Sequence, residues 1–509
     1  MFELLGAALL GILQAKYLIP LAVGTFVGVI GGSLPGVTIT MTVIVVLPFT
    51  FGLDPLQGLA AMTGVYVGGS AGGLVTAILL GIPGTPSAIA TTFDGHPLAR
   101  RGEPGRAIWI GVWASFFGGL LGGVFLIAAT GPLAQFALQF GPWEFFALFL
   151  FALSMVAGLV EASLLKGLIA GALGCVVKVL GNDPVMGQER LTLGLDVLEG
   201  GVDFLPVLIG VFAFSQIMGE VERAGGARRF AEAVDRTVSL AVSQLRVLAE
   251  VVSRPLLVLW CSFIGVVIGV LPAIGGSAAN MIAYDQAKKF SRRPQAFGTG
   301  TPEGIIASES ANNANVGGSL VTIMAFGIPG DAVTAVMLGA LTIHGIQSGP
   351  LFIMQNAKLA YGIFAAYILA HFVMVVVLAL SARFMLRVVT VPKAALFPVV
   401  LVLCAVGAYA LNNTMSNVYM LFAFGVLGYL MVKYGFPLAP FILGVILGDQ
   451  IEINLVRAIM TDSNPLLFFT RPISGALIVL SVASVVFAAW QHRRHHGRLA
   501  AAGGGETDF

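Results

Sequence analysis

The chain carries one glycine- and proline-containing motif twice, and this duplication constrains the fold more than any other feature. Residues 72–84 and 318–330 are identical at eight of thirteen aligned positions, and both copies end in Gly-Ile-Pro-Gly. A second pair, residues 28–35 and 265–272, begins with Gly-Val and ends with Leu-Pro in both copies. Proline removes a backbone donor and glycine permits unusual φ values, so each copy should break a helix. Paired breaks of this kind indicate the substrate site of a transporter.

The composition indicates that these helices cross a membrane. Apolar residues make up 57% of the 509 positions and charged residues only 10%, whereas soluble proteins carry about 25% charged residues. Uncharged segments such as Ala107–Gln135 and Leu256–Ala279 exceed the roughly 20 residues that cross a hydrocarbon core. We therefore expect an all-α polytopic membrane protein.

The loops around the two motif copies have opposite charge bias. Between the first and second motifs, the second half has Lys288, Lys289, Arg292 and Arg293, whereas the first half has only Asp54. After the second motif the bias reverses, with Arg100, Arg101 and Arg106 in the first half and only Lys358 in the second. Short basic loops stay in the cytoplasm, so equivalent loops should face opposite sides. We predict two inverted-topology repeats with broken helices or re-entrant hairpins.

The same charges divide the chain into four parts. Residues 1–222 are predicted as the N-terminal transmembrane repeat and residues 254–490 as the C-terminal one. Residues 223–253 are polar with scattered apolar positions and predict a cytoplasmic or interfacial helical linker. The basic residues 491–509 predict a cytoplasmic tail.

Helix ends at the breaks suit an anion, because a helix N-terminus presents unpaired N–H groups and a positive dipole end. Nearby hydroxyls add donors. Simple kinks and close packing of small residues are the alternative explanation. The candidate substrate-binding residues are Ser33, Pro35, Gly36, Thr38, Pro83, Gly84, Thr85, Ser87, Pro329 and Gly330.

Residues 308–315 form the densest polar stretch inside an apolar region. Carboxamides at membrane depth face partners, water or a ligand, and their oxygens suit Na⁺. Structural interhelical bonds are the alternative. A proton is the other coupling ion to consider, although no acid is obviously placed for it, which favours Na⁺. The candidate ion-coupling residues are Asn280, Ser308, Asn312, Asn313, Asn315 and Asp331, the last also a candidate N-cap; no other cofactor is expected.

Four segments resemble the large membrane subunit of the tripartite tricarboxylate transporter family: Gly28–Gly36, Gly72–Thr85, Phe93–Leu98 and Pro302–Asp331. The resemblance implies a bacterial inner-membrane secondary transporter that works with a small membrane subunit of about four helices and a periplasmic solute-binding protein. It also implies import of citrate, another di- or tricarboxylate or an aromatic acid, driven by a Na⁺ or H⁺ gradient.

Two function classes remain open on the residues themselves. One is an ion-coupled carboxylate importer that works by alternating access. The other is a channel or secondary transporter for an uncharged solute without a binding-protein partner. An enzyme is not expected, because the spans offer no acid/base pair beside a nucleophile and no P-loop. No nucleic-acid partner is expected either.

Overall fold

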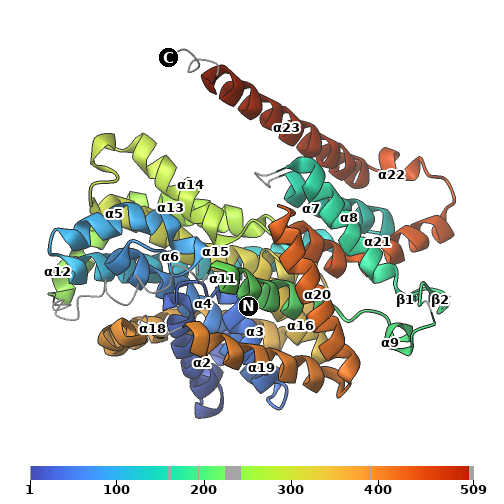
Figure 1. Ribbon diagram of the computed structural model, residues 1–509, viewed down its shortest axis with the longest axis horizontal. Coiled ribbons are helices and arrows are strands. Elements are labelled where there is room, and N and C mark those ends of the chain that lie inside the picture. Colours follow the sequence, from blue (N-terminus) through green and yellow to red (C-terminus); the bar gives the residue numbers. More distant parts are fainter. Residues whose placement is uncertain are drawn as a thin grey trace. The chain divides into compact units, whose positions relative to one another are not determined.

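A computed structural model of the chain describes residues 2–158, 163–192, 194–223, 242–388, 391 and 393–503. Within these ranges the chain is almost entirely helical (Figure 1), and the strands are the short antiparallel pair β1 (Gly181–Asn182) and β2 (Glu189–Arg190). Nine helices of the described part are long and apolar enough to cross a membrane. This confirms the predicted all-α polytopic class. Most of the predicted linker, residues 224–241, and the end of the predicted tail, residues 504–509, lie outside the described residues.

The chain forms two compact units. The first unit comprises Met1–Ala137 and Phe212–Val418, and the second comprises Leu138–Val211 and Tyr419–Phe509. All four motif copies lie in the first unit, so this unit holds the candidate site.

The first unit contains the same order of five helices twice. The first copy consists of α2 (Ala15–Ser33), α3 (Ile39–Thr50), α4 (Pro55–Leu80), α5 (Ile89–Arg100) and α6 (Pro104–Ala137). The second copy consists of α13 (Pro255–Val270), α14 (Gly275–Phe290), α15 (Pro302–Phe326), α16 (Ala332–Ile343) and α18 (Ala357–Val388). The remaining elements of this unit are α1 (Phe2–Ile12), η1 (Pro86–Ala88), most of the π-helical turn η2 (Gly210–Phe214), α11 (Ser215–Arg223), α12 (Gln244–Val252), η4 (Pro294–Ala296), α17 (Phe352–Gln355) and α19 (Lys393–Asn412).

The helices break at the motifs. α4 ends at Gly81 and α15 ends at Gly327, with φ angles of 69° and 73°, in the left-handed region that favours glycine. The other motif pair separates α2 from α3 and α13 from α14, where Gly275 has φ 73°. The breaks predicted from glycine and proline are therefore present. The opposite orientation of the two copies stays a prediction.

Backbone contacts through glycine repeat in both copies. A Cβ placed on Gly28 would lie 2.3 Å from the carbonyl oxygen of Val65, and one on Gly265 would lie 2.2 Å from that of Ala311. The same correspondence holds further along, for Gly32 with Gly69 and for Gly269 with Asn315, both at 2.3 Å. α2 thus packs on α4, and α13 on α15, at a distance that only glycine permits.

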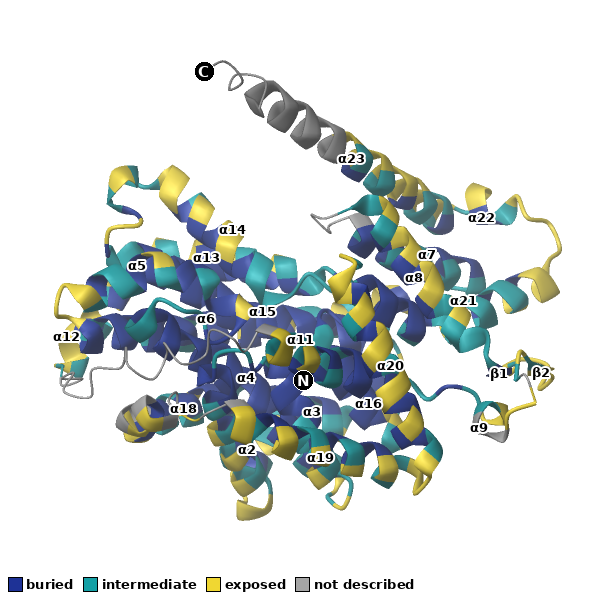
Figure 2. Ribbon diagram, in the orientation of Figure 1, coloured by how far each residue is buried: buried dark blue, intermediate teal, exposed yellow. Residues whose placement is uncertain are grey.

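The two copies interlock. The long helix α6 of the first copy packs against α15 of the second, and α18 packs against α4. In the same way, α3 contacts α16 and α14 contacts α5. The central helices α4 and α15 are buried along most of their lengths (Figure 2). Polar residues on these helices are therefore enclosed by protein from both halves.

The second unit has its own core. It contains α7 (Pro142–Gly158), α8 (Leu164–Val179), α9 (Asp196–Glu199), α10 (Phe204–Ile209), most of α20 (Met415–Lys433), α21 (Leu438–Thr461), α22 (Leu467–Thr470) and α23 (Pro472–Gly503). A Cβ on Gly174 of α8 would lie 2.0 Å from the carbonyl oxygen of Phe441 in α21. Buried Glu144 accepts a 2.6 Å hydrogen bond from Arg471, whose guanidinium lies over the Trp143 ring. The pairing with Arg471 offsets part of the desolvation cost of this carboxylate in the first turn of α7.

Candidate functional site

The two Gly-Ile-Pro-Gly turns pack against backbone of the other motif. A Cβ on Gly84 would lie 2.1 Å from the carbonyl oxygen of Gly32, and one on Gly330 would lie 2.5 Å from that of Gly269. Both turns therefore close directly onto the ends of α2 and α13. Pro83 and Pro329 precede these glycines, so the local sequence places the helix break and the close contact together.

Asp331 begins the helix that follows the second turn. Its side chain accepts a 2.8 Å hydrogen bond from the backbone N–H of Thr334, and the Thr334 hydroxyl accepts from the Asp331 backbone N–H at 2.9 Å. This reciprocal arrangement is a capping box, so the predicted N-cap role is present. Tyr66 of α4 and, at 3.4 Å, Ser319 of α15 also donate to the carboxylate.

The first turn is followed by hydroxyls instead of an acid. The Thr85 and Ser87 hydroxyl oxygens lie 3.0 Å apart, and either can donate. The residues that precede η1 and α5, Thr85 and Ala88, make no side-chain capping bond in the described structure. Instead, Asn280 of α14 accepts a 2.7 Å hydrogen bond from the N–H of Ala90 in the first turn of α5. Asn280 therefore caps a helix of the other copy. The two turns differ in charge although their backbones correspond.

The start of α14 faces both the first turn and the polar face of α15. A Cβ on Gly276 would lie 2.8 Å from Asn312 Oδ1, 3.2 Å from Ser87 Cβ and 3.6 Å from Asn315 Nδ2. Gly275, one residue earlier, faces Asp331, with 3.5 Å between its added Cβ and the Asp331 Cβ. Candidate residues from both copies thus meet around this glycine pair.

The asparagines of α15 point in different directions. Asn312 Nδ2 donates to the carbonyl oxygen of Ser70 in α4 at 2.9 Å. Asn315 is 1% exposed, and its Oδ1 has no hydrogen-bond partner within the described structure. Asn313 instead faces α18, where its Nδ2 lies 3.5 Å from the Met374 sulfur. Asn312 and Asn315 can therefore share one site with Gly276, whereas Asn313 lies elsewhere.

The remaining candidate residues lie at and after the end of α2, and two of them, Gly36 and Thr38, contact Gln216 of α11. Ser33 donates to the carbonyl oxygens of Val29 at 2.7 Å and Gly72 at 3.0 Å, so its hydroxyl joins α2 to α4. Thr38 caps α3 through the Met41 N–H and also bonds Gln216 Oε1 at 3.1 Å. Pro35 and Gly36 form the turn between these residues, and Gly36 has φ 88° and a carbonyl bonded by Gln216.

Sequence reasoning missed Glu309. It is fully buried, and its oxygens accept from the Thr91 hydroxyl at 2.5 Å and the Ser115 hydroxyl at 2.9 Å. The Ser308 hydroxyl, a candidate ion ligand, lies 3.0 Å from the Thr91 hydroxyl. The expectation that the spans lack a well-placed buried acid is therefore wrong. An acid in the middle of a helix with little other charge was the available signal.

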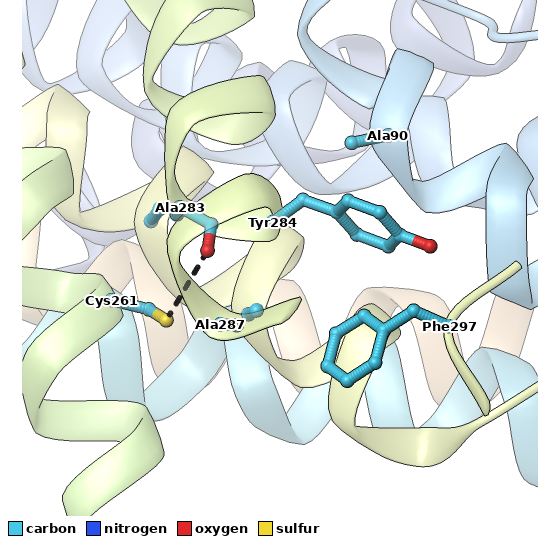
Figure 3. Close-up of a cluster of buried hydrophobic side chains, with 8 residues drawn as sticks. Ala90, Cys261, Ala283, Tyr284, Ala287 and Phe297 are labelled. Carbon is cyan, nitrogen blue, oxygen red and sulfur yellow. Dashed lines mark hydrogen bonds between the residues drawn. The ribbon is translucent and has the colours of Figure 1, made fainter. Parts of the chain in front are cut away.

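Asp94 was also missed. Its carboxylate accepts from the backbone N–H groups of Gly298, Gly300 and Thr301 at 2.7–3.0 Å and from the Tyr284 hydroxyl at 2.8 Å. Figure 3 shows the Tyr284 ring beside Phe297 in an apolar cluster that also includes Ala90 and Cys261. Asp94 thus joins α5 to α14 and to the turn before α15.

Metal binding by acidic or sulfur ligands has no support in the described residues. They contain no group of three His, Cys, Asp or Glu side chains that could hold a metal ion. A monovalent cation bound by hydroxyl, amide and carboxylate oxygens is chemically compatible with the polar face of α15.

These features define a multi-pass helical membrane protein with a duplicated broken-helix core and a buried polar interior. The chain belongs to the tripartite tricarboxylate transporter TctA family, whose family model matches residues 18–443. This confirms the resemblance seen in the motifs. The family is one of transporters and belongs to tripartite systems.

Two relatives come from Agrobacterium vitis. An uncharacterized 52.8 kDa protein in the TAR-I ttuC′ 3′ region is 34% identical over 471 residues, which cover 92% of each chain. An uncharacterized protein in the TAR-II ttuC′ 3′ region is 33% identical over 225 residues, which cover 44% of this chain and 93% of the relative. No solved structure matches the chain.

Proposed function

We propose that this chain is the permease subunit of a cation-coupled importer of di- or tricarboxylates or other organic carboxylates in the bacterial inner membrane. It would receive substrate from a periplasmic solute-binding protein and work with a small membrane subunit of about four helices. Its C-terminus would lie in the cytoplasm. The observation that carries this proposal is the pair of Gly-Ile-Pro-Gly turns, each followed by a helix start, beside the polar face of α15.

Helix starts supply the anion site. Among the described residues no Lys or Arg is buried, so a carboxylate would be held by backbone N–H groups, hydroxyls and amides. Thr85 and Ser87 lie on the turn without an acid, which makes that turn the better place for a negative substrate. The chemistry fits a carboxylate without fixing its size.

The charge of the core supports cation coupling. Asp331 and Glu309 are both buried in it. An anion that enters beside two carboxylates is repelled at low dielectric unless cations enter with it. Na⁺ or H⁺ bound near α15 would remove this repulsion, and would couple uptake to the cation gradient.

Alternating access would follow from the interlocked copies. Because α6 packs on α15 and α18 on α4, a movement of one copy changes the surroundings of the other copy's central helix. Inverted repeats carry out such movements as nearly rigid bodies around a central site.

One observation favours the second candidate, a channel or transporter for an uncharged solute that needs no binding protein. The absence of buried Lys and Arg among the described residues removes the strongest anion-binding side chains.

Uptake by proteoliposomes separates the two candidates. The chain would be reconstituted with its small membrane subunit, and labelled citrate or succinate supplied with and without the solute-binding protein under an imposed Na⁺ or pH gradient. We expect gradient-dependent uptake that requires the binding protein. Gradient-independent flux of uncharged solutes such as glycerol, without the binding protein, would overturn the importer.

A further inference from the structure

Among its described residues the first unit buries three carboxylates, Asp94, Glu309 and Asp331, and they differ in their hydrogen-bond partners. Asp94 accepts three backbone N–H bonds and a tyrosine hydroxyl. Asp331 accepts a backbone N–H and hydroxyls from three side chains. Glu309 accepts from two hydroxyls, those of Thr91 and Ser115, with the neutral Asn312 amide as a further neighbour. Glu309 is therefore the least satisfied of the three.

The surroundings of Glu309 come from both copies. Thr91 lies on α5 and Ser115 on α6, and the added Cβ of Gly111 would lie 3.5 Å from the Glu309 stem. Asn280 of α14 donates to the Thr91 hydroxyl at 3.4 Å. The carboxylate thus lies where α5 and α6 meet α14 and α15.

The other charged and titratable groups on these helices, or packed against them, are bonded to other partners or exposed; Arg100 and Lys288 are exposed. Within the described structure the pairs are Arg106 with Glu103 and Glu250, Arg254 with Glu303, Lys289 with Asp285, Tyr284 with Asp94, Tyr66 with Asp331, His96 with the Ile78 carbonyl and His371 with the Tyr367 carbonyl. No cationic side chain is bonded to Glu309 in the described residues. A buried carboxylate without a cationic partner is unfavourable in its charged form unless it binds a cation or a proton.

The corresponding position in the first copy has no acid. By the motif alignment Glu309 matches Thr63 of α4, which is fully buried and whose hydroxyl lacks a partner in the described structure. The duplicated fold therefore places a carboxylate at this position in one copy alone.

We infer that the Glu309 carboxylate binds the monovalent cation that is transported together with the substrate. The cation is either a proton on the carboxyl group or Na⁺ held between Glu309 and the hydroxyl oxygens of Thr91, Ser115 and Ser308. This inference rests on the proposed function. Because the site is built from both copies, a movement of one copy relative to the other exposes or encloses the carboxylate.

The test is Glu309→Gln, which keeps the shape and removes the charge. In proteoliposomes, counterflow exchanges labelled for unlabelled carboxylate without net cation movement, whereas accumulation requires the gradient. We expect Glu309→Gln to retain counterflow and lose gradient-driven accumulation. Accumulation equal to that of the unmodified protein would overturn the inference. If the glutamine variant does not fold, Glu309→Asp should fold and show weaker apparent cation affinity, and unchanged affinity would overturn it.

A direct binding measurement distinguishes the two cations and does not depend on transport. Binding of ²²Na⁺ to purified protein at constant pH should fall in Glu309→Gln if Na⁺ occupies the site. If a proton occupies it, ²²Na⁺ binding is unchanged and proton uptake on acidification is smaller by one per chain. If Glu309→Gln alters neither ²²Na⁺ binding nor proton uptake, the inference is overturned. Ser381→Ala in α18, a buried serine whose hydroxyl donates to the Val377 carbonyl, is the matched control and should leave both quantities unaltered. If the unmodified protein exchanges no carboxylate, the proposed function fails while the binding comparison still tests Glu309.

Discussion

Tyr66 of α4 donates a hydrogen bond to Asp331, the residue that caps α16, although 265 positions separate them in the chain. The bond joins the central helix of one copy to the helix break of the other. By the motif alignment Tyr66 matches Asn312, which bonds back to the carbonyl oxygen of Ser70. The side chains at these two corresponding positions each bond the other copy, Tyr66 through a hydroxyl to a carboxylate and Asn312 through an amide to a backbone carbonyl.

Replacing Tyr66 tests this link. Tyr66→Phe removes one donor from Asp331, and a hydrogen bond to a charged group contributes about 1.5–3 kcal/mol. The capping bond from Thr334 remains, so we expect lower uptake and a lower unfolding temperature, with near-normal abundance in membranes. Tyr419→Phe, at an exposed position, is the control. Unchanged uptake in Tyr66→Phe would show that the bond has no role in transport.

The glycines of the two turns should resist substitution. A Cβ at Gly84 or Gly330 meets a backbone carbonyl oxygen at 2.1 or 2.5 Å, and overpacking costs about 1–3 kcal/mol. We expect Gly84→Ala and Gly330→Ala to cut uptake severely. Thr85→Val should cut it less, because a neutral hydrogen bond contributes about 0.5–1.5 kcal/mol net. Gly131→Ala, with nothing within 4 Å of its added Cβ, is the control and should leave uptake unchanged. Normal uptake in both turn variants would contradict the assignment.

Asp94 should act on stability. Asp94→Ala leaves three backbone N–H groups before α15 without this acceptor. The N–H of Gly300 is buried, and an unsatisfied buried group costs about 1–3 kcal/mol. We expect a large fall in membrane abundance and unfolding temperature. Asp94→Asn retains one acceptor oxygen and should be intermediate. The fraction of each Asp94 variant that folds should keep the ratio of accumulation to counterflow of the unmodified protein. A lower ratio would show that Asp94 takes part in cation coupling.

The asparagines of α15 should differ by face. Asn315→Ala and Asn312→Ala should raise the half-saturating concentration of substrate or cation, because these side chains lie against the start of α14. Asn313 faces Met374 of α18 instead, so Asn313→Ala should alter thermal stability more than transport kinetics. Unchanged kinetics in all three single variants would refute an asparagine role in binding.

Labelling tests the orientation of the two copies. Gly52 and Gln295 lie in corresponding loops and are exposed, and the added Cβ of Gly52 has nothing within 4 Å. In a Cys175→Ala background, where the remaining cysteines Cys261 and Cys404 are buried, Gly52→Cys and Gln295→Cys should react with an impermeant maleimide from opposite sides. Reaction from the same side would rule out the inverted repeat.

The helix breaks were predictable because their cause is local. A glycine with positive φ and a proline without an N–H end a helix in almost any surroundings, and the structure ends α4 and α15 at Gly81 and Gly327. The different directions of Asn313 and Asn315 could also have been predicted, because helix neighbours lie three or four positions apart. The class of fold followed from composition in the same way.

The partners of the polar residues were not predictable. Asp94 meets N–H groups 204–207 positions away, and Glu309 meets hydroxyls 194 and 218 positions away. No local pattern reports such distances, because they depend on which helix of one copy packs against which helix of the other. For this reason the sequence around Glu309 predicts a polar stretch but not a separate role for its carboxylate.

The exchange of long helices between the copies has an evolutionary consequence. Since α6 covers α15 and α18 covers α4, a change in side-chain volume on one copy alters the fit of the other. The halves are therefore not free to diverge as independent modules, even though their sequences differ at Thr63, Tyr66 and Thr85 and the positions that match them. Selection for a new substrate at one turn must be compatible with the packing that the opposite half provides.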